Sequence, residues 1–245
     1  GEGGDSPLSS LNQPTADPML TIIEKILDAQ EVHDFRQRLA TAEWRDGADS
    51  AGTRSVKVKQ NLQLGRQNEL AVALGHIILR KLGNDPLFVS ASLAEKIWPP
   101  IFNLYQDGGH YGTHSDAALM RLPEANLTIR SDLSATLFLS EPDEYDGGEL
   151  VIEEHYGAQP VKLAAGDMIL YPSSSLHQVT PVTRGQRICA ITWMQSAVAD
   201  AAAREMLFDL DQSIQALSPD RPDDDADINR LVHVYHNMLR RWASP

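Results

Sequence analysis

Cysteine is almost absent from the sequence, since Cys189 is the only one in 245 residues. No disulfide can form within the chain, which excludes the disulfide-rich secreted domains and fits a reducing cytoplasm. No apolar run approaches the length that spans a bilayer, and the first residues show no basic segment followed by an apolar one. We therefore expect a cytoplasmic protein without a signal peptide and without a membrane partner.

Basic residues are also in deficit, with 21 Lys and Arg against 34 Asp and Glu and a net charge of −13. Nucleic acid and anionic membranes repel an acidic protein, and no stretch combines aromatic and basic residues for base stacking. We therefore expect no nucleic-acid partner. Arg54, Lys57, Lys59 and Arg66 are close in sequence, but the pattern favours a solvated strand edge over a basic groove.

Three segments differ in their residue pattern. Residues 1–18 are rich in Gly, Ser, Pro and Asp, which predicts a disordered leader. Residues 19–196 form the main predicted domain, in which helical spacing gives way after Phe88 to many short apolar runs separated by turns. Residues 197–245 form a predicted extension of two amphipathic helices, whose apolar stripes fit either the domain core or a homodimer interface.

The stretch from Tyr105 to Asp116 reads Tyr-Gln-Asp-Gly-Gly-His-Tyr-Gly-Thr-His-Ser-Asp. Residues two apart in an extended segment point to the same side, so His114 and Asp116 can reach one metal ion. An imidazole and a carboxylate suit iron, and one more His completes a 2-His-1-carboxylate triad. His177 is the candidate third ligand, because it follows another short apolar run.

Arg187 begins a further strand-like run, ten residues after His177. If it points into a barrel, so do Cys189, Ile191 and Trp193, since side chains alternate along a strand. A guanidinium on a dry wall pairs best with a carboxylate held bidentately, and the phenol of Tyr105 is a second candidate donor to the same ligand. Spacing alone supports equally a structural salt bridge for the Arg and core packing for the Tyr.

Together these motifs resemble a known family. Tyr105…His114-Ser-Asp116…His177…Arg187 is similar to the iron(II)- and 2-oxoglutarate-dependent dioxygenases of the prolyl/lysyl hydroxylase type. The resemblance is closer still to the bacterial PKHD-type hydroxylases, through residues 103–116, 145–150 and 165–177, and it runs from about Met19 to the C-terminus.

The resemblance implies an α+β protein with a double-stranded β-helix (jelly roll) core, flanking helices and the C-terminal helical extension. It makes 19–196 the iron(II)/2-oxoglutarate dioxygenase domain, with His114, Asp116 and His177 as iron ligands. Arg187 would hold the distal carboxylate of 2-oxoglutarate and Tyr105 would be a second contact.

At the position of Trp193, hydroxylases of this type often have an aromatic residue near the iron. The implied reaction converts 2-oxoglutarate and dioxygen to succinate and CO2 while it hydroxylates an unactivated C–H bond. The substrate is a peptide, an amino acid or another small metabolite, and dependence on ascorbate is expected only at the level of the family.

Two other functions fit parts of the sequence. A cupin-like module that binds a metal without turnover would share the jelly roll, but it needs no buried guanidinium after its last ligand. A nucleic-acid demethylase would share the iron chemistry, but the acidic charge opposes it.

Overall fold

The computed structural model of the chain describes residues 20–47, 58–122, 126–154 and 157–244. The leader expected over 1–18 lies outside these residues. The helices are α1 (Ala29–Ala40), α2 (Glu69–Asn84), α3 (Pro86–Ser92), α4 (Ala201–Leu217) and α5 (Ala226–Trp242), and a 3-10 turn, η4 (Ser218–Asp220), follows α4. In the described part of the chain, no helix has both the length and the apolar composition needed to cross a bilayer.

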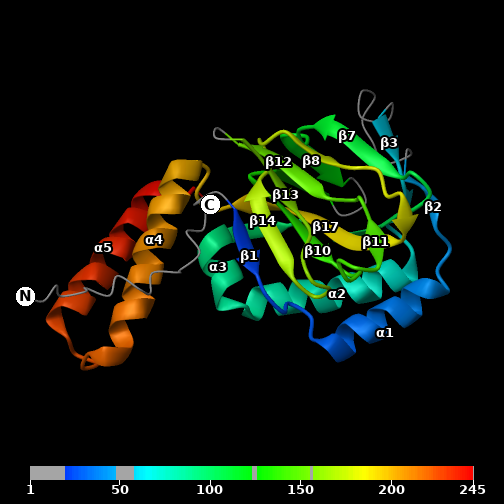
Figure 1. The fold of residues 1–245 in the computed structure, drawn as a ribbon. Coiled ribbons are helices and arrows are strands. Elements are labelled where there is room, and N and C mark those ends of the chain that lie inside the picture. The colour runs from blue at the N-terminus through cyan, green and yellow to red at the C-terminus, as the bar shows by residue number, and fades with distance from the viewer. Residues whose placement is uncertain (1–19, 48–57, 123–125, 155–156, 245) are drawn as a thin grey trace, which may run out of the picture.

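Two antiparallel sheets form the body of the protein (Figure 1). The larger sheet has the strand order β1 (Thr21–Ile23), β14 (Met168–Pro172), β10 (Leu133–Phe138), β17 (Arg187–Ser196), β6 (Ile101–Tyr105), β4 (Leu62–Gln63) and β2 (Arg45–Asp46), with β5 (Ala94–Ile97) also paired to β17. The smaller sheet has the order β13 (Gly157–Val161), β12 (Leu150–Glu154), β15 (His177–Val179), β7 (His110–His114) and β3 (Lys59–Gln60).

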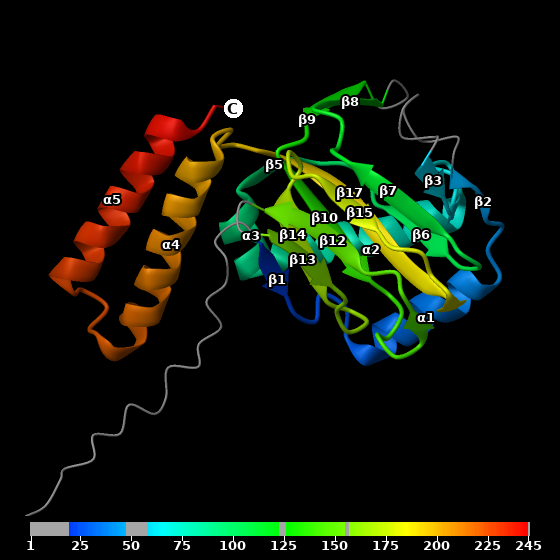
Figure 2. The ribbon, with the colours of Figure 1, turned by 45° about the horizontal axis from the view of Figure 1, so that its top comes forward.

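Two short antiparallel pairs lie outside these sheets. One joins β11 (Tyr145–Asp146) to β16 (Arg184–Gly185), and the other is the hairpin of β8 (Leu119–Leu122) and β9 (Leu127–Arg130). Figure 2 shows this hairpin at the opposite side of the molecule from α1. The expectation of a sheet-rich α+β core with flanking helices is therefore confirmed.

The strands of the larger sheet divide their side chains between two apolar cores. Alternate residues of β17, such as Ile188 and Ala190, pack with α1, α2 and α3, whereas Cys189 packs with residues of the smaller sheet. The same alternation in β6 sends Phe102 to the helices and Tyr105 toward the smaller sheet. The predicted alternation of β17 is thus confirmed, and the face between the sheets is left for a site.

The helices that cover the larger sheet begin at side-chain caps. The segment Asp28-Ala-Gln-Glu31 has the residue spacing of a capping box. In the structure Asp28 accepts from the backbone N–H of Glu31, and the carboxylate of Glu31 accepts from the N–H of Asp28, so the capping box is formed. Val32, Phe35 and Leu39 of α1 are then buried against the sheet. Burial of each such side chain contributes about 1.5–3 kcal/mol relative to its exposure, which fastens the helix to the sheet.

The apolar spacing from Asn68 to Leu82 predicts a helix that is stopped by Gly83 with Pro86 just beyond it, and the observed α2 ends two residues later than this. The helix continues through Gly83 to Asn84, and Asp85 takes an extended conformation directly before Pro86. Proline disfavours the helical conformation in the residue before it, so Pro86 ends α2. The same proline is the first residue of α3, a position at which a helix needs no backbone N–H donor. The apolar pattern alone did not predict α3.

The two C-terminal helices form a hairpin that extends to one side of the sheets (Figure 1). Leu207 of α4 packs with Tyr235, Leu239 and Trp242 of α5. α4 also contacts α3, where the hydroxyl of Ser90 donates to Asp211 at 2.6 Å. On the exposed side of α5, Nε2 of His233 accepts a hydrogen bond from Nδ2 of Asn237 at 2.9 Å.

Gly166 occupies the predicted turn between β13 and β14 with φ +98°, and a Cβ there would lie 2.3 Å from the carbonyl oxygen of Leu27. We expect Gly166→Ala to lower the free energy of unfolding by about 2 kcal/mol or more, because it combines a left-handed backbone with a backbone clash. Gly83→Ala is the matched control, since nothing lies within 4 Å of its added Cβ. This control should be neutral or stabilising by up to about 1 kcal/mol. Urea unfolding of the two variants would contradict the prediction if both gave the same midpoint.

Candidate functional site

His114, Asp116 and His177 come together between the two sheets. His114 ends β7 and His177 begins β15, and the two are direct partners across this antiparallel pair. Their rings therefore lie on the same face, with centroids 4.3 Å apart. One donor atom from each of the three residues lies within 4.8 Å of the others, and among the described residues they form the one such group of potential metal ligands.

Backbone carbonyls orient both imidazoles. Nδ1 of His114 lies 2.8 Å from the oxygen of Gly112, and Nδ1 of His177 lies 3.0 Å from the oxygen of Ser175. A carbonyl can only accept, so each Nδ1 carries the hydrogen and donates it. In the neutral ring Nε2 then keeps its lone pair, and both Nε2 atoms face Asp116, at 3.9 and 3.8 Å from its oxygens. This is how metal-binding histidines are held in proteins.

Asp116 is tied to the larger sheet. The hydroxyl of Ser134 on β10 donates to Oδ2 at 2.6 Å, and Ser173 lies 2.7 Å from the same hydroxyl. The carboxylate is thereby held at the gap between the sheets while its other oxygen, Oδ1, faces His114. Two imidazoles and one carboxylate, oriented in this way, suit Fe(II).

Burial keeps His114 neutral. Burial, with a smaller contribution from the nearby His177, lowers the pKa of this imidazole to about 4, so the ring is uncharged at neutral pH. The ring of Tyr111 stacks on it at 3.6 Å between centroids, and Tyr171 meets His177 edge-on at 5.2 Å. These aromatic contacts restrict the rings to orientations in which Nε2 is available.

Arg187 lies on the facing sheet with only 1% of its surface exposed. Within the described part of the chain its guanidinium makes no ion pair. Its one hydrogen bond runs from Nη1 to Sγ of Cys189 at 3.0 Å, and Nε has no partner. Burial raises the pKa of the Cys189 thiol, so this neighbour is a neutral group and cannot balance the charge. A buried cation without a carboxylate is costly, which makes a ligand carboxylate the expected partner.

The predicted neighbours of Arg187 surround its side chain. Tyr105 is its direct partner across β6 and β17, and the rings of Tyr105 and Phe138 each lie with their centroids 5.2 Å from the guanidinium carbon. Burial raises the pKa of the Tyr105 phenol, so the hydroxyl stays protonated and is a donor. Gly148 has φ +67°, and a Cβ there would lie 3.0 Å from Cδ of Arg187. The Gly-Gly turn of the sequence therefore leaves room for the Arg stem.

All the predicted site residues line one cavity of about 410 Å³ between the sheets. His114, Asp116 and His177 form one part of its wall, and Tyr105, Arg187 and Trp193 another. Trp193 is partly buried, and its indole nitrogen has no hydrogen-bond partner. The cavity thus combines a candidate metal centre, an unpaired cation and aromatic walls.

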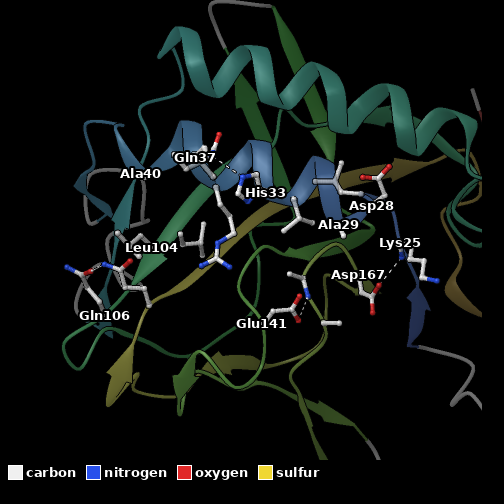
Figure 3. A pocket seen from close by; sticks show the side chains of 18 of the residues that line it. Lys25, Asp28, Ala29, His33, Gln37, Ala40, Leu104, Gln106, Glu141 and Asp167 are labelled. Carbon is white, nitrogen blue, oxygen red and sulfur yellow. Dashed lines mark hydrogen bonds between the residues drawn. The ribbon is translucent and has the colours of Figure 1, made fainter.

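A second hollow, of about 1270 Å³, lies under α1 and is more open (Figure 3). Its polar groups stabilise local backbone. Asp167 accepts from the N–H of Lys25 at 2.8 Å, and Glu141 accepts from the N–H of Ala165 at 3.2 Å. Among the described residues no cluster of potential metal ligands lies there. The smaller cavity between the sheets is therefore the better candidate for chemistry.

Three contributors to the site were not predicted. Ser134 and Tyr171 carry no sequence signal, because only the pairing of β10 and β14 brings them to the metal ligands. Tyr111 lies inside the Tyr105–Asp116 motif. Its neighbours two residues away are Gly109 and Thr113, which are not candidate ligands, so the sequence pattern did not identify Tyr111 as a site residue. Its stacking on His114 depends on the local twist of β7.

Comparisons with known proteins agree with this geometry. Residues 100–195 match the model of the 2OG-Fe(II) oxygenase superfamily, and residues 201–244 match that of the PKHD-type hydroxylase C-terminal domain. A PKHD-type hydroxylase of Teredinibacter turnerae is 58% identical over 92% of this chain and 99% of its own length. Another, from Acidovorax ebreus, is 56% identical over 93% of this chain and 100% of its own length.

Solved structures are more distant in sequence and support the fold. An oxidoreductase of the 2OG-Fe(II) oxygenase family from Burkholderia pseudomallei is 16% identical, with a TM-score of 0.50 over 73% of this chain and 86% of its own. HygX from Streptomyces hygroscopicus, solved with nickel, 2-oxoglutarate and hygromycin B bound, is 14% identical, with a TM-score of 0.50 over 73% and 84% of the two chains.

Ser134→Ala removes the hydroxyl that donates to Asp116. We expect the variant to bind Co²⁺, a visible probe of the candidate centre, about tenfold more weakly, because hydrogen bonds to ligating carboxylates typically contribute 10- to 100-fold in affinity. Ser173→Ala is the control, since it leaves the Ser134 hydroxyl free to reach Asp116. A Co²⁺ titration followed by absorption would refute the role of Ser134 if the two variants bound the ion equally well.

Proposed function

Because the chain belongs to the PKHD-type hydroxylases, within the 2OG-Fe(II) oxygenase superfamily, we propose that it hydroxylates an unactivated C–H bond of a peptide or small-molecule substrate. Dioxygen and 2-oxoglutarate are consumed, and succinate and CO2 are the coproducts. The observation that carries the proposal is the buried guanidinium of Arg187. It forms no ion pair with a carboxylate of the described residues, and it lines the same cavity as the cluster of two His and one Asp.

His114, Asp116 and His177 would hold Fe(II) through two Nε2 atoms and a carboxylate oxygen. Their fit is supported by the carbonyl-oriented imidazoles and by the Ser134 hydroxyl on Asp116. When bound, Fe(II) supplies the redox chemistry that couples decarboxylation of 2-oxoglutarate to oxidation of the substrate. The protein's own part is to hold both imidazoles in the tautomer with a free Nε2, through the backbone carbonyls that accept from Nδ1.

Arg187 and Tyr105 would position the cosubstrate. The guanidinium pairs with the distal carboxylate of 2-oxoglutarate, and the neutral phenol donates a hydrogen bond to the same group. Because the surrounding wall is apolar and aromatic, water is kept from competing for that carboxylate. Trp193, two strand steps beyond Ile191 on the same face of β17, would form the wall nearer the iron and limit the orientation of the substrate.

The strand order supports a double-stranded β-helix. The chain passes from β6 to β7, from β10 to β12, from β13 to β14 and from β15 to β17, and each step changes sheet. Alternate crossing between two facing antiparallel sheets is the connection pattern of jelly rolls. We accordingly propose residues 19–196 as the dioxygenase domain and 197–245 as the helical extension.

Other features stay predictions of the sequence. They are a cytoplasmic location, dependence on ascorbate, a homodimer, and the absence of nucleic-acid and membrane partners. A screen of free amino acids, peptides and metabolites for stimulated succinate formation tests the proposed activity and identifies the substrate.

Replacing the proposed ligands tests the metal centre. We expect His114→Ala and His177→Ala to lose tight Fe(II) binding and Asp116→Ala to lose turnover, because each removes one of three protein ligands. The matched control is the exposed pair His233→Ala and His236→Ala in α5, which should bind Fe(II) as the unaltered protein does. Anaerobic Fe(II) titration and succinate formation are the measurements. Full iron occupancy with normal turnover would remove the altered residue from the centre.

Arg187→Ala tests the cosubstrate site. The lost charge-assisted pair corresponds to about 1.5–3 kcal/mol, and the carboxylate left unpaired in a dry cavity adds to the loss. We expect the half-saturation for 2-oxoglutarate to rise by roughly ten- to several-hundred-fold. Arg187→Lys should restore only part of the affinity, because it lacks the planar fork.

The readout is the visible charge-transfer band of the anaerobic Fe(II) complex during a 2-oxoglutarate titration. Fe(II) binding itself should persist in both Arg187 variants, because the guanidinium is not a ligand. An unchanged half-saturation in Arg187→Ala would mean that the cosubstrate is held elsewhere.

A further inference from the structure

The charged side chains around the candidate cavity are of one sign, apart from the proposed iron ligand. Besides Asp116 and Arg187, the charged residues that line the cavity are Lys59, Arg66 and Arg121. No other Asp or Glu of the described residues lines it, although acidic residues outnumber basic ones by 34 to 21 in the chain. The basic rim of the cavity is therefore opposite in sign to the protein as a whole.

Three separate elements contribute this rim. Lys59 lies on β3, Arg66 lies in the loop between β4 and α2, and Arg121 lies on β8. Figure 1 shows β3, β7 and β8 on the side of the molecule away from α1 and α2. Because the hairpin of β8 and β9 follows Asp116 directly in the chain, Arg121 is carried to the mouth of the same cavity.

The two arginines are exposed and available. Within the described part of the chain neither Arg66 nor Arg121 makes an ion pair or a side-chain hydrogen bond, and both side chains reach solvent. Lys59 differs, because most of it is buried beside the ring of Tyr111, with Nζ 5.3 Å from the ring centroid. Burial lowers the pKa of Lys59 to about 8 and the carboxylate of Asp46 partly opposes this shift, so it is still mostly charged at neutral pH.

The same cavity also has apolar and aromatic lining residues, among them Trp98, Ile101, Tyr111, Met120 and the largely exposed Leu119. A substrate bound there therefore has both cationic groups and an apolar surface within reach.

From this arrangement, and given the proposed function, we propose that the substrate carries an anionic oxygen group, a carboxylate or a phosphate. Arg66 and Arg121 bind this group at the rim, while an apolar part of the substrate extends along Tyr111 and Met120 to the metal centre. Guanidinium forks match both oxygen groups in geometry, and a cleft lined by one sign of charge also speeds the encounter with an oppositely charged ligand. Arg66 and Arg121 are thus specificity-determining residues for the hydroxylation.

The same charges would attract 2-oxoglutarate, which is itself a dianion, and the two roles predict different results. Arg187 is buried at 1% exposure and is the proposed partner of the cosubstrate, whereas Arg66 and Arg121 are exposed at the mouth. If Arg66 and Arg121 bind the substrate, replacing both should weaken the binding of a second anion to protein whose Arg187 is already paired with 2-oxoglutarate. If it serves the cosubstrate, 2-oxoglutarate affinity should change instead.

The test uses the full chain loaded with Mn²⁺, which replaces Fe(II) without turnover, and saturated with 2-oxoglutarate. The probes are 3-phenylpropanoate, phenyl phosphate and the neutral 3-phenylpropanamide. Proton relaxation of their phenyl rings reports how closely each ring approaches the paramagnetic ion. We expect strong enhancement for the two anions and little for the amide, and comparison of the two anions distinguishes carboxylate from phosphate.

Arg66→Gln with Arg121→Gln should raise the half-saturation of the anionic probes by about tenfold, the order expected for two partly solvated charge-assisted contacts. The control replaces two exposed arginines elsewhere, Arg80→Gln on α2 and Arg241→Gln on α5, and changes the net charge equally. Its half-saturation should match that of the unaltered protein.

Three outcomes would overturn the inference: equal relaxation of anions and amide, equal losses in the test and control variants, or a loss confined to 2-oxoglutarate affinity. Failure of the proposed function is seen separately and earlier, as absence of Mn²⁺ or 2-oxoglutarate binding by the unaltered protein.

Discussion

Burying the guanidinium of Arg187 costs free energy, because no carboxylate of the described residues forms an ion pair with it, and the fold around it is arranged to maintain that state. β17 passes through the middle of the larger sheet between β10 and β6, so its first residue is held in register with Tyr105. The aromatic rings of Tyr105 and Phe138 lie near the guanidinium, and Gly148 leaves space for its stem. A site held in this way is ready for a carboxylate before the ligand arrives, which limits the ordering that binding requires.

The two sheets contribute different residues to the site. The smaller sheet presents His114 and His177 as direct partners on β7 and β15, whereas the larger sheet presents Arg187. Ser134 links the two by donating from β10 to Asp116. Because α1, α2 and α3 cover the outer face of the larger sheet, its strands have little freedom to shift. The packing of one sheet on the other therefore sets the distance between the candidate metal ligands and the guanidinium of Arg187.

The arginines of the basic rim lie outside the strands of the two main sheets. Arg66 and Arg121 come from a loop and a hairpin outside the two main sheets, and both side chains are exposed. Loops carried by a rigid scaffold can vary without disturbing the centre beneath them.

Much of the site was predictable because its residues lie in short motifs whose period agrees with extended backbone. His114 and Asp116 are two apart, and Arg187 and Cys189 alternate with outward apolar residues, so local geometry alone placed each pair on one face. The end of α2 was predicted two residues early, because Gly83 is tolerated inside the helix and Pro86, which was also named as part of the stop signal, acts on Asp85, the residue before it. The hairpin of β8 and β9 was missed because each of its strands is only four residues long, too short for a clear alternation of apolar and polar residues.

The sequence by itself determined the chemical types of the site, the strand alternation and the capped starts of the helices, since these depend on neighbours within a few residues. Tertiary structure alone decided that His177 lies opposite His114, that Ser134 reaches Asp116 and that Arg187 has no carboxylate partner among the described residues. It also decided that Lys59, Arg66 and Arg121 surround one cavity, where the sequence had favoured a solvated strand edge for the first two. Such relations join residues far apart in the chain, and only the pairing and packing of the sheets bring them within reach of one another.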